Sequence, residues 1–226
     1  MRKSIFMILA VPVILIGIVL VDNRNSGDMN IRQKILKTIY PFFSRLTRLS
    51  KTKDGTYTSG TPVEPPVPFH SLSASMNNGD TLQMSDLKGK MVLLVNTASD
   101  CGYTPQYEAI QTLYERYGSR LVVIGFPAND FKEQEKGTDA EIEAFCRINY
   151  GVTFPLAAKS SVVKGPAQNP VFRWLSDRSL NGWNDREPVW NFSKYLIDGS
   201  GHLVGYFEPS VDPNGREIGD LLDAKD

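Results

Sequence analysis

The sequence predicts an α/β domain in which helices flank a central mixed sheet, preceded by an N-terminal membrane segment. Three observations support this fold class. A long apolar run lies near the N-terminus, and from Phe69 onward apolar stretches of strand and helix periodicity alternate. Two apolar stretches near the C-terminus are joined by the turn residues 198–201, which is typical of a hairpin. With 226 residues, 41% of them hydrophobic, the chain can bury one sizeable core.

The apolar run extends from Ile5 to Val21 and follows the cations Arg2 and Lys3. At ~1.5 Å per residue, a helix of this length just crosses the hydrocarbon core of a bilayer. No small-x-small cleavage pattern follows the run, which favours an uncleaved anchor over a cleaved signal segment at residues 1–22. We therefore expect a membrane-anchored protein, or a secreted one if the segment is removed. The extracytoplasmic side is favoured, and the cytoplasmic side is the alternative.

Residues 23–66 are predicted to be a basic juxtamembrane segment and a proline-rich linker. Between Arg24 and Lys53 there are eight Lys or Arg residues and one acid, a net charge of +7. Cations directly after a span favour retention in the cytoplasm, so the side of the membrane stays open. Apolar residues recur among the cations of 31–51, which is typical of a helix lying on an anionic membrane surface and bent at Pro41. A solvated linker is the alternative.

The domain, residues 67–226, is predicted to begin its core with Met91 to Asn96, an uninterrupted apolar run typical of a strand buried on both faces. A helix is expected next, with Thr104 as its N-cap and Pro105 in its first turn. Five apolar side chains at helical spacing form the expected buried face: Tyr107, Ile110, Leu113, Tyr114 and Tyr117.

A second buried strand is expected over Arg120 to Pro127. A second helix follows, because Thr138 and Glu141 have the spacing of a capping box and Gly151 provides a stop signal. Its apolar face contains Ile142, Phe145 and Cys146. The hairpin strands are then expected at Trp190 to Ile197 and His202 to Phe207, followed by a closing helix near Gly215 to Leu222.

Composition excludes several functions. From Asp54 onward the chain carries 15 basic and 23 acidic residues, a net charge of −8, which argues against a nucleic-acid partner. Two cysteines and two histidines, none of them close together in the sequence, are unsuited to a metal site or a disulfide scaffold. We therefore expect neither a metal nor another cofactor.

Cys101 is the candidate reactive group, because it lies in the turn between the first buried strand and the helix that follows. Unpaired N–H groups at a helix N-terminus favour negative charge, so we expect a lowered pKa for Cys101 and an enriched, nucleophilic thiolate. The alternative is a buried, inert cysteine. Polar neighbours argue against it, namely Asn96, Thr97, Ser99 and Asp100.

Four blocks of the sequence resemble the glutathione peroxidase family in its cysteine form: "VNTASDCGYTPQYEAIQTLYERYG", "GFPANDFKEQEKGT", "FCRINYGVTFP" and "WNFSKYLID". They occur in the family's order and span roughly Pro68 to Leu222. The resemblance implies a thioredoxin-like fold and a thiol peroxidase. In that chemistry the Cys101 thiolate attacks a peroxide oxygen, water or an alcohol leaves, and a sulfenic acid remains.

The resemblance also implies that Trp190 and Asn191 donate hydrogen bonds to the reactive sulfur. A third donor, usually a glutamine, is replaced by Asp130, whose carboxylate accepts hydrogen bonds and would raise the pKa of a nearby thiol. Asp130 is therefore expected to point away, to share a proton with Cys101, or to be replaced in its role by Asn129 or Gln134. A reduced peroxidase rate is a further alternative.

By the same resemblance, Cys146 is the candidate resolving cysteine, although the segment after it is one residue longer than in some two-cysteine relatives. A role in the core alone is the alternative, because Cys146 lies on an apolar helix face. Acids crowd the part of the sequence expected at the Cys101 end of the sheet and would repel anionic glutathione, so a thioredoxin-like reductant is expected. These acids are Asp100, Asp130, Glu133, Glu135, Asp139, Glu141 and Glu143.

The predicted function is reduction of hydrogen peroxide or of organic and lipid hydroperoxides. Two alternatives remain open from the sequence. In the first, the protein is a redox sensor or relay, in which a Cys101–Cys146 disulfide is passed to a protein partner. In the second, the protein is a weakly active or inactive family member because of Asp130.

Overall fold

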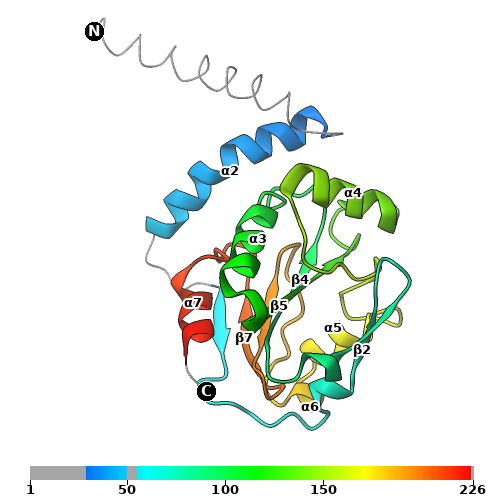
Figure 1. The fold of residues 1–226 in the computed structure, drawn as a ribbon, viewed down its shortest axis with the longest axis vertical. Coiled ribbons are helices and arrows are strands. Elements are labelled where there is room, and N and C mark those ends of the chain that lie inside the picture. Colours follow the sequence, from blue (N-terminus) through cyan, green and yellow to red (C-terminus); the bar gives the residue numbers. More distant parts are fainter. Residues whose placement is uncertain (1–28, 50–54, 225–226) are drawn as a thin grey trace, which may run out of the picture.

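The computed structural model describes residues 29–49 and 55–224 (Figure 1). The predicted membrane segment, Ile5 to Val21, lies outside these residues. Within the described ranges, no helix combines the length and apolar character needed to cross a bilayer. The described chain comprises helix α2 (Ile31–Leu49) and an α/β domain that follows it.

The central sheet is mixed, as predicted. Strands β4 and β5 are parallel neighbours, whereas the other neighbouring pairs are antiparallel. In order across the sheet, the strands are β1 (Thr56–Thr58), β7 (Leu203–Phe207), β6 (Lys194–Ile197), β4 (Met91–Thr97) and β5 (Leu121–Pro127). A separate small hairpin consists of β2 (Ser73–Ser75) and β3 (Thr81–Gln83).

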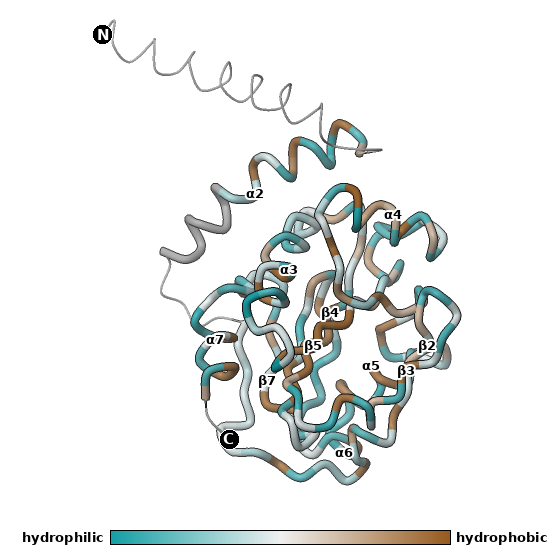
Figure 2. The backbone as a smooth tube through the Cα atoms, viewed as in Figure 1, coloured by the Kyte–Doolittle hydropathy of each residue, from teal (hydrophilic) through white to brown (hydrophobic). Residues whose placement is uncertain are grey.

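Helices cover both faces of this sheet, because the apolar side chains of β4 alternate between two cores. Leu93 and Val95 face the core shared with α3, α4 and α7, whereas Val92 and Leu94 face the core shared with α5. The brown stretches of β4 and β5 in Figure 2 mark this buried centre. The helices are α3 (Gln106–Tyr117), α4 (Asp139–Tyr150), α5 (Pro170–Leu175), α6 (Arg178–Asn181) and α7 (Arg216–Asp223). Single 3₁₀ turns occur at Phe69–Ser71, Met84–Leu87 and Gly118–Arg120.

The predicted capping box of α4 is confirmed. The Thr138 hydroxyl accepts a hydrogen bond from the Glu141 backbone N–H, and the Glu141 carboxylate accepts one from the Thr138 N–H. Gly151 ends the helix with a left-handed φ of 63°, a conformation that glycine adopts without steric cost. The chain between β5 and α4 is therefore held at a defined helix start.

The predicted N-cap of α3 is wrong. The helix begins at Gln106, its capping position is Pro105, and no side chain caps it. The Thr104 hydroxyl instead accepts from the Cys101 N–H at 3.0 Å and donates to the Ala98 carbonyl at 2.8 Å. These bonds turn Thr104 back towards the loop, so it closes the cysteine turn and does not cap the helix.

Two other boundaries differ from the prediction. The strand expected from Trp190 begins at Lys194, because Trp190 to Phe192 form a turn in which Phe192 has a left-handed φ of 68°. The segment expected to be a linker contributes β1, which pairs with β7 at the edge of the main sheet. The predicted closing helix is confirmed as α7.

Helix α2 packs against the domain with its first half (Figure 1). The Gln33 amide donates to the Ser99 carbonyl at 3.0 Å, and Arg32 pairs with Asp100 at 3.0 Å. The Lys37 ammonium donates to the Asn149 carbonyl at 2.8 Å. This half of the helix therefore contacts the domain, which neither the membrane-surface helix nor the solvated linker predicts.

Candidate active site

Cys101 lies in a tight loop directly after the carboxyl end of β4, as predicted. Its side chain is buried. The Thr104 N–H donates to the Cys101 carbonyl at 3.1 Å, so Thr104 bonds both the N–H and the carbonyl of Cys101. These two contacts hold the cysteine backbone in one orientation before α3 begins.

Three N–H groups surround the Cys101 sulfur. The Tyr103 backbone N–H lies 3.4 Å from Sγ, and the side chains of Trp190 and Asn191 hydrogen-bond to the same atom. The structure thus brings together the cysteine, indole and amide that the resemblance implies, and adds a backbone donor. Each donor favours a negatively charged sulfur over a neutral one.

Asn96 of β4 links the cysteine loop to the turn that carries the indole and the amide. Its side-chain amide donates to the Trp190 backbone carbonyl at 3.1 Å, and its backbone carbonyl accepts from the Phe192 N–H at 2.6 Å. Because β6 pairs with β4, these bonds continue the sheet into the turn. Trp190 and Asn191 are therefore positioned by the same strand that positions Cys101.

The expected lowering of the cysteine pKa is not found. Burial raises the pKa of the Cys101 thiol above its ordinary value and outweighs the lowering by the Tyr103, Trp190 and Asn191 hydrogen bonds and the Arg32 charge. The α3 helix begins at Gln106, five residues after the cysteine, so its N-terminus lies beyond the cysteine turn. The three donors, and not a helix end, are the main charge-stabilising groups at this sulfur.

Asp130 lies away from the Cys101 sulfur. One carboxylate oxygen accepts from the Ser161 hydroxyl at 2.7 Å, and the other accepts from the Val162 N–H at 2.9 Å. The side chain is exposed and connects two loops. Of the expected alternatives, the structure has the one in which Asp130 points away.

Gln134, and not Asp130, contacts the Asn191 amide. Its Oε1 accepts from the Asn191 amide at 3.1 Å, and its backbone carbonyl accepts from the Asp100 N–H at 3.0 Å. Asn129 has a different role, because its side chain accepts from the Glu135 N–H at 2.9 Å and closes the loop. Gln134 is thus joined both to the cysteine loop and to Asn191.

Comparisons with known proteins agree with this geometry. A sequence model of the glutathione peroxidase family matches residues 69–176. The chain is 43% identical to "Glutathione peroxidase" of Lactococcus lactis subsp. cremoris over 150 residues, which are 66% of this chain and 94% of that protein. It is 42% identical to "Hydroperoxy fatty acid reductase gpx1" of Synechocystis sp., over 65% of this chain and 89% of that protein.

The chain belongs to the glutathione peroxidase family. It is a peroxidase, an oxidoreductase that acts on peroxide. Its fold matches the crystal structure of Trgpx in apo form with a TM-score of 0.53 and 31% identity, over 70% of this chain and 97% of that chain. It matches the crystal structure of T. cruzi GPX1 with a TM-score of 0.54 and 27% identity, over 69% of this chain and 94% of that chain. The predicted thioredoxin-like α/β fold is thereby confirmed.

Cys146, the candidate resolving cysteine of this peroxidase, is a buried free thiol on α4. It belongs to the same apolar core as Cys101. Burial raises the pKa of Cys146 to about 12, and the carboxylates of Glu135 and Glu143 also raise it. With α4 folded, Cys146 is therefore a neutral core residue, and a resolving role requires movement of the helix.

Glu135, one of the acids crowded in this part of the sequence, is a buried carboxyl group. It is 1% exposed, and its Oε2 accepts from the Ser99 hydroxyl at 3.0 Å. Burial raises its pKa to about 7, although the bonds from Ser99 and the charge of Lys159 lower it. No sequence signal distinguishes it, because it lies within a run of charged residues.

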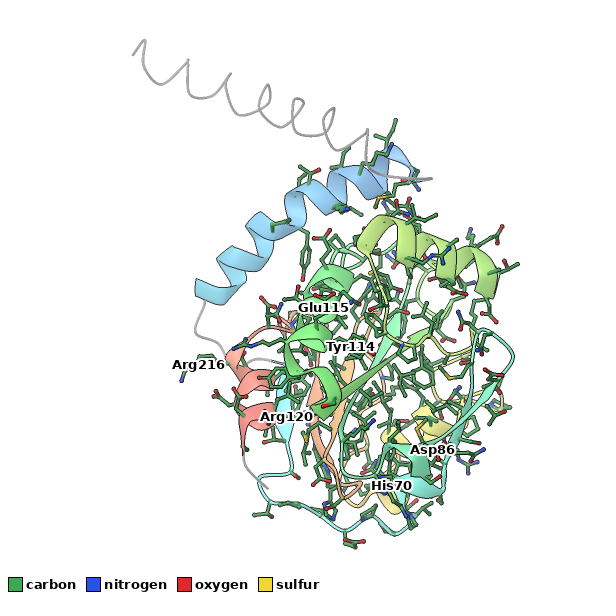
Figure 3. The ribbon with its side chains drawn as sticks, viewed as in Figure 1. His70, Asp86, Tyr114, Glu115, Arg120 and Arg216 are labelled. Atoms are coloured by element: carbon green, nitrogen blue, oxygen red, sulfur yellow. The ribbon has the colours of Figure 1, made fainter. Side chains whose placement is uncertain are left out.

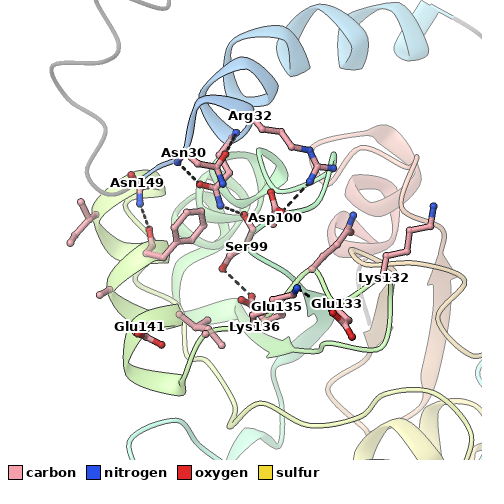
Figure 4. Close-up of a pocket in the computed structure, with 17 residues that line it drawn as sticks. Asn30, Arg32, Ser99, Asp100, Lys132, Glu133, Glu135, Lys136, Glu141 and Asn149 are labelled. Atoms are coloured by element: carbon pink, nitrogen blue, oxygen red, sulfur yellow. Dashed lines mark hydrogen bonds and ion pairs between the residues drawn. The ribbon is translucent and has the colours of Figure 1, made fainter.

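A cavity of about 870 Å³ lies beside the cysteine loop of the peroxidase (Figure 4). Its walls come from the start of α2, the loop at 99–100, the segment 132–137 and α4. Its acids are partly compensated, since Arg32 pairs with Asp100 and Lys136 pairs with Glu133 at 3.2 Å. The charged side chains that line the cavity are therefore of both signs.

The described residues include no group of three or more His, Cys, Asp or Glu side chains that could hold a metal ion. His70 and Asp86 lie at the end of the domain opposite α2 (Figure 3). His202 contacts Asp198 and Glu64 at 2.8 and 2.9 Å.

Proposed function

We propose that this peroxidase reduces hydrogen peroxide or organic hydroperoxides, including those of lipids, through Cys101. The thiolate attacks the terminal peroxide oxygen, so that an S–O bond forms while the O–O bond breaks. The leaving oxygen takes a proton and departs as water or an alcohol, and Cys101 is left as a sulfenic acid. The observation that carries this proposal is the set of three N–H donors around the Cys101 sulfur, from Tyr103, Trp190 and Asn191.

The same donors serve both the reactant and the transition state. Burial raises the pKa of Cys101, so the thiolate is a minor form at neutral pH and deprotonation contributes to the barrier. Negative charge moves from sulfur to the departing oxygen during the attack. The Trp190 and Asn191 N–H groups are close enough to the sulfur to stabilise charge along this path.

The second half of the proposed cycle uses Cys146. Its thiol attacks the Cys101 sulfenic acid, which forms a disulfide and releases water. A dithiol reductant of the thioredoxin kind then reduces the disulfide by exchange and is itself oxidised. Relatives named "Glutathione peroxidase-like peroxiredoxin 2" of Saccharomyces cerevisiae, 39% identical, and "Hydroperoxy fatty acid reductase gpx1" support a thiol-dependent cycle and a lipid-derived substrate.

Single-turnover oxidation tests this function. The purified protein is mixed with one equivalent of hydrogen peroxide or of a fatty acid hydroperoxide, and peptides containing Cys101 and Cys146 are analysed by mass spectrometry. The expected product is a Cys101–Cys146 disulfide, and in a Cys146→Ser variant it is a sulfenic acid at Cys101. An unmodified Cys101 after both peroxides would exclude the proposed chemistry.

We also propose that the protein is attached to a membrane through Ile5 to Val21, outside the described residues. The support is the length and apolar character of this run and the basic segment after it. Attachment would raise the concentration of lipid hydroperoxides near Cys101. The full chain is expected to remain in the membrane fraction after extraction at alkaline pH. Release into the soluble fraction would contradict attachment through a spanning segment.

A further inference from the structure

The loop from Asn129 to Glu135 has Asp130 where the resemblance implies a glutamine. It also contains Gln134, an amide side chain that contacts the site. Both oxygens of the Asp130 carboxylate accept hydrogen bonds, from the Ser161 hydroxyl and the Val162 N–H. Both oxygens of the Asp130 side chain therefore bind the loop that contains Ser161 and Val162. The position that the resemblance assigns to an amide donor contributes no contact to the Cys101 sulfur.

The backbone after Asp130 forms a turn that contains two consecutive left-handed residues. Lys132 and Glu133 both have left-handed φ values, 53° and 52°. Residues other than glycine rarely adopt this backbone conformation. Two such residues in succession persist only where surrounding contacts hold them. After this turn, Gln134 contacts the cysteine loop.

Contacts on both sides hold Gln134 in place. Its carbonyl accepts from the Asp100 N–H at 3.0 Å. The next residue, Glu135, accepts from the Ser99 hydroxyl at 3.0 Å (Figure 4) and donates its N–H to the Asn129 side chain at 2.9 Å. The loop is therefore tied to the residues just before Cys101 and closed on itself.

The Gln134 side chain accepts a hydrogen bond from the Asn191 side chain. The Asn191 amide nitrogen donates to Gln134 Oε1 at 3.1 Å, and the same side chain hydrogen-bonds the Cys101 sulfur. The side-chain oxygen of Asn191, Oδ1, is buried and has no hydrogen-bond partner among the described residues. Rotating this amide by half a turn would place the oxygen against the sulfur and repel a thiolate. The Gln134 acceptor favours the productive orientation.

We propose that Gln134 is a positioning residue of the peroxidase site and takes over the role left by Asp130. It holds the Asn191 amide so that an N–H points at the Cys101 sulfur. The inference rests on the proposed function of Cys101, which it deepens. Gln134 lies four positions after Asp130, the position that the resemblance indicates.

The test compares Gln134→Met, which keeps the length but removes the acceptor, with Asp130→Asn, both in a Cys146→Ser background. The pH dependence of Cys101 alkylation by iodoacetamide reports its pKa without any peroxide. Gln134→Met is expected to raise this pKa and to lower the second-order rate of peroxide oxidation at least about tenfold, the effect of losing one hydrogen bond to a charged group. Asp130→Asn is expected to shift the alkylation profile much less.

A matched control is Gln83→Met on the exposed face of β3, which should change neither readout. If Gln134→Met does not fold, Gln134→Ala replaces it, which also removes the acceptor without adding charge and should raise the Cys101 pKa. An unshifted alkylation profile in the Gln134 variant, or a larger shift in Asp130→Asn, would overturn the proposal. A wild-type Cys101 that is inert to peroxide but shows the Gln134-dependent profile would contradict only the proposed function.

Discussion

At the scale of single residues, the reactivity of Cys101 depends on the balance between burial and hydrogen bonding. Burial raises the pKa of the thiol, and three N–H donors oppose this effect without cancelling it. The donors are worth more at a buried sulfur than in water, because little solvent competes with them. Removing one donor should therefore change the reaction rate more than the stability.

Trp190→Phe tests one donor alone, because it keeps the aromatic ring and removes the indole N–H. The contact of the ring with Phe131, at 5.5 Å between centroids, can be retained. We expect oxidation of Cys101 to slow on the order of tenfold, as for loss of a hydrogen bond to a charged group. Stopped-flow fluorescence or competitive oxidation measures this rate.

The matched control is Trp183→Phe, whose indole donates to the Leu203 carbonyl at 2.6 Å. This variant should lose stability but retain the oxidation rate. Equal rates in Trp190→Phe and the wild type would show that the indole N–H does not assist the reaction.

Glu135 should make stability depend on pH. Burial raises its pKa from 4.5 to about 7, so between these values the folded protein binds more protons at this group than the unfolded chain does. The free energy of unfolding therefore decreases as pH rises through this window, by on the order of 3 kcal/mol from this group. In Glu135→Gln this contribution is absent, while an oxygen that can accept from Ser99 remains.

Urea unfolding of the wild type and Glu135→Gln at about pH 5 and about pH 8 measures the difference. The variant is expected to gain stability relative to the wild type at the higher pH. The same difference in stability at both pH values would contradict a raised pKa.

At the scale of elements, helix α2 restrains the helix that carries Cys146. The Lys37 ammonium binds the Asn149 carbonyl in the last turn of α4 and pairs with Glu108 of α3 at 3.4 Å. A cation at the C-terminus of a helix stabilises its final carbonyls. Because Cys146 lies one turn earlier, release of this contact should ease the opening of α4 that disulfide formation requires.

Lys37→Met is expected to accelerate Cys101–Cys146 disulfide formation roughly fivefold, corresponding to one lost hydrogen bond of about 1 kcal/mol. Quenched-flow alkylation after one equivalent of peroxide measures the rate, and hydrogen exchange of the α4 amides reports its opening. Ile31→Ala is the control, because this side chain is 76% exposed on the same helix. Faster disulfide formation in both variants, or in neither, would contradict a restraint by Lys37.

The elements themselves were largely predictable, because periodicity and capping are local properties. The α4 capping box and its Gly151 stop are confirmed, whereas Thr104 was wrongly predicted to cap α3. A threonine before a proline looks like a helix start. The Thr104 hydroxyl instead accepts from the Cys101 N–H and donates to the Ala98 carbonyl. Whether it forms these bonds or caps the helix depends on the fold of the loop.

At the scale of the whole molecule, the relatives and this chain share the α/β domain, whereas α2 precedes residues 69–176 that match the family model. The addition places Arg32 near the cysteine loop and contributes one wall of the cavity there. The charges around the site are thus of both signs. Preference between reductants must therefore come from protein contacts more than from simple repulsion of an anion.

We expect the oxidised protein to be reduced faster by a thioredoxin than by glutathione at comparable thiol concentrations. An internal disulfide exchanges readily with a dithiol, whereas glutathione must act twice through a mixed disulfide. Recovery of free Cys101 and Cys146 with each donor is measured by alkylation and mass spectrometry. Faster recovery with glutathione would overturn the proposed reductant.

The fold class was predictable because it follows from periodicity along the chain, and Cys101, Trp190 and Asn191 were indicated because they lie in motifs that the family shares. Three further features emerge from the folded chain: Asp130 points away from the sulfur, Gln134 contacts Asn191, and Glu135 is buried. These three residues lie in one charged segment that carries no periodic signal. Their roles depend on a left-handed turn and on contacts with residues distant in the sequence, which a reading of neighbours along the chain does not contain.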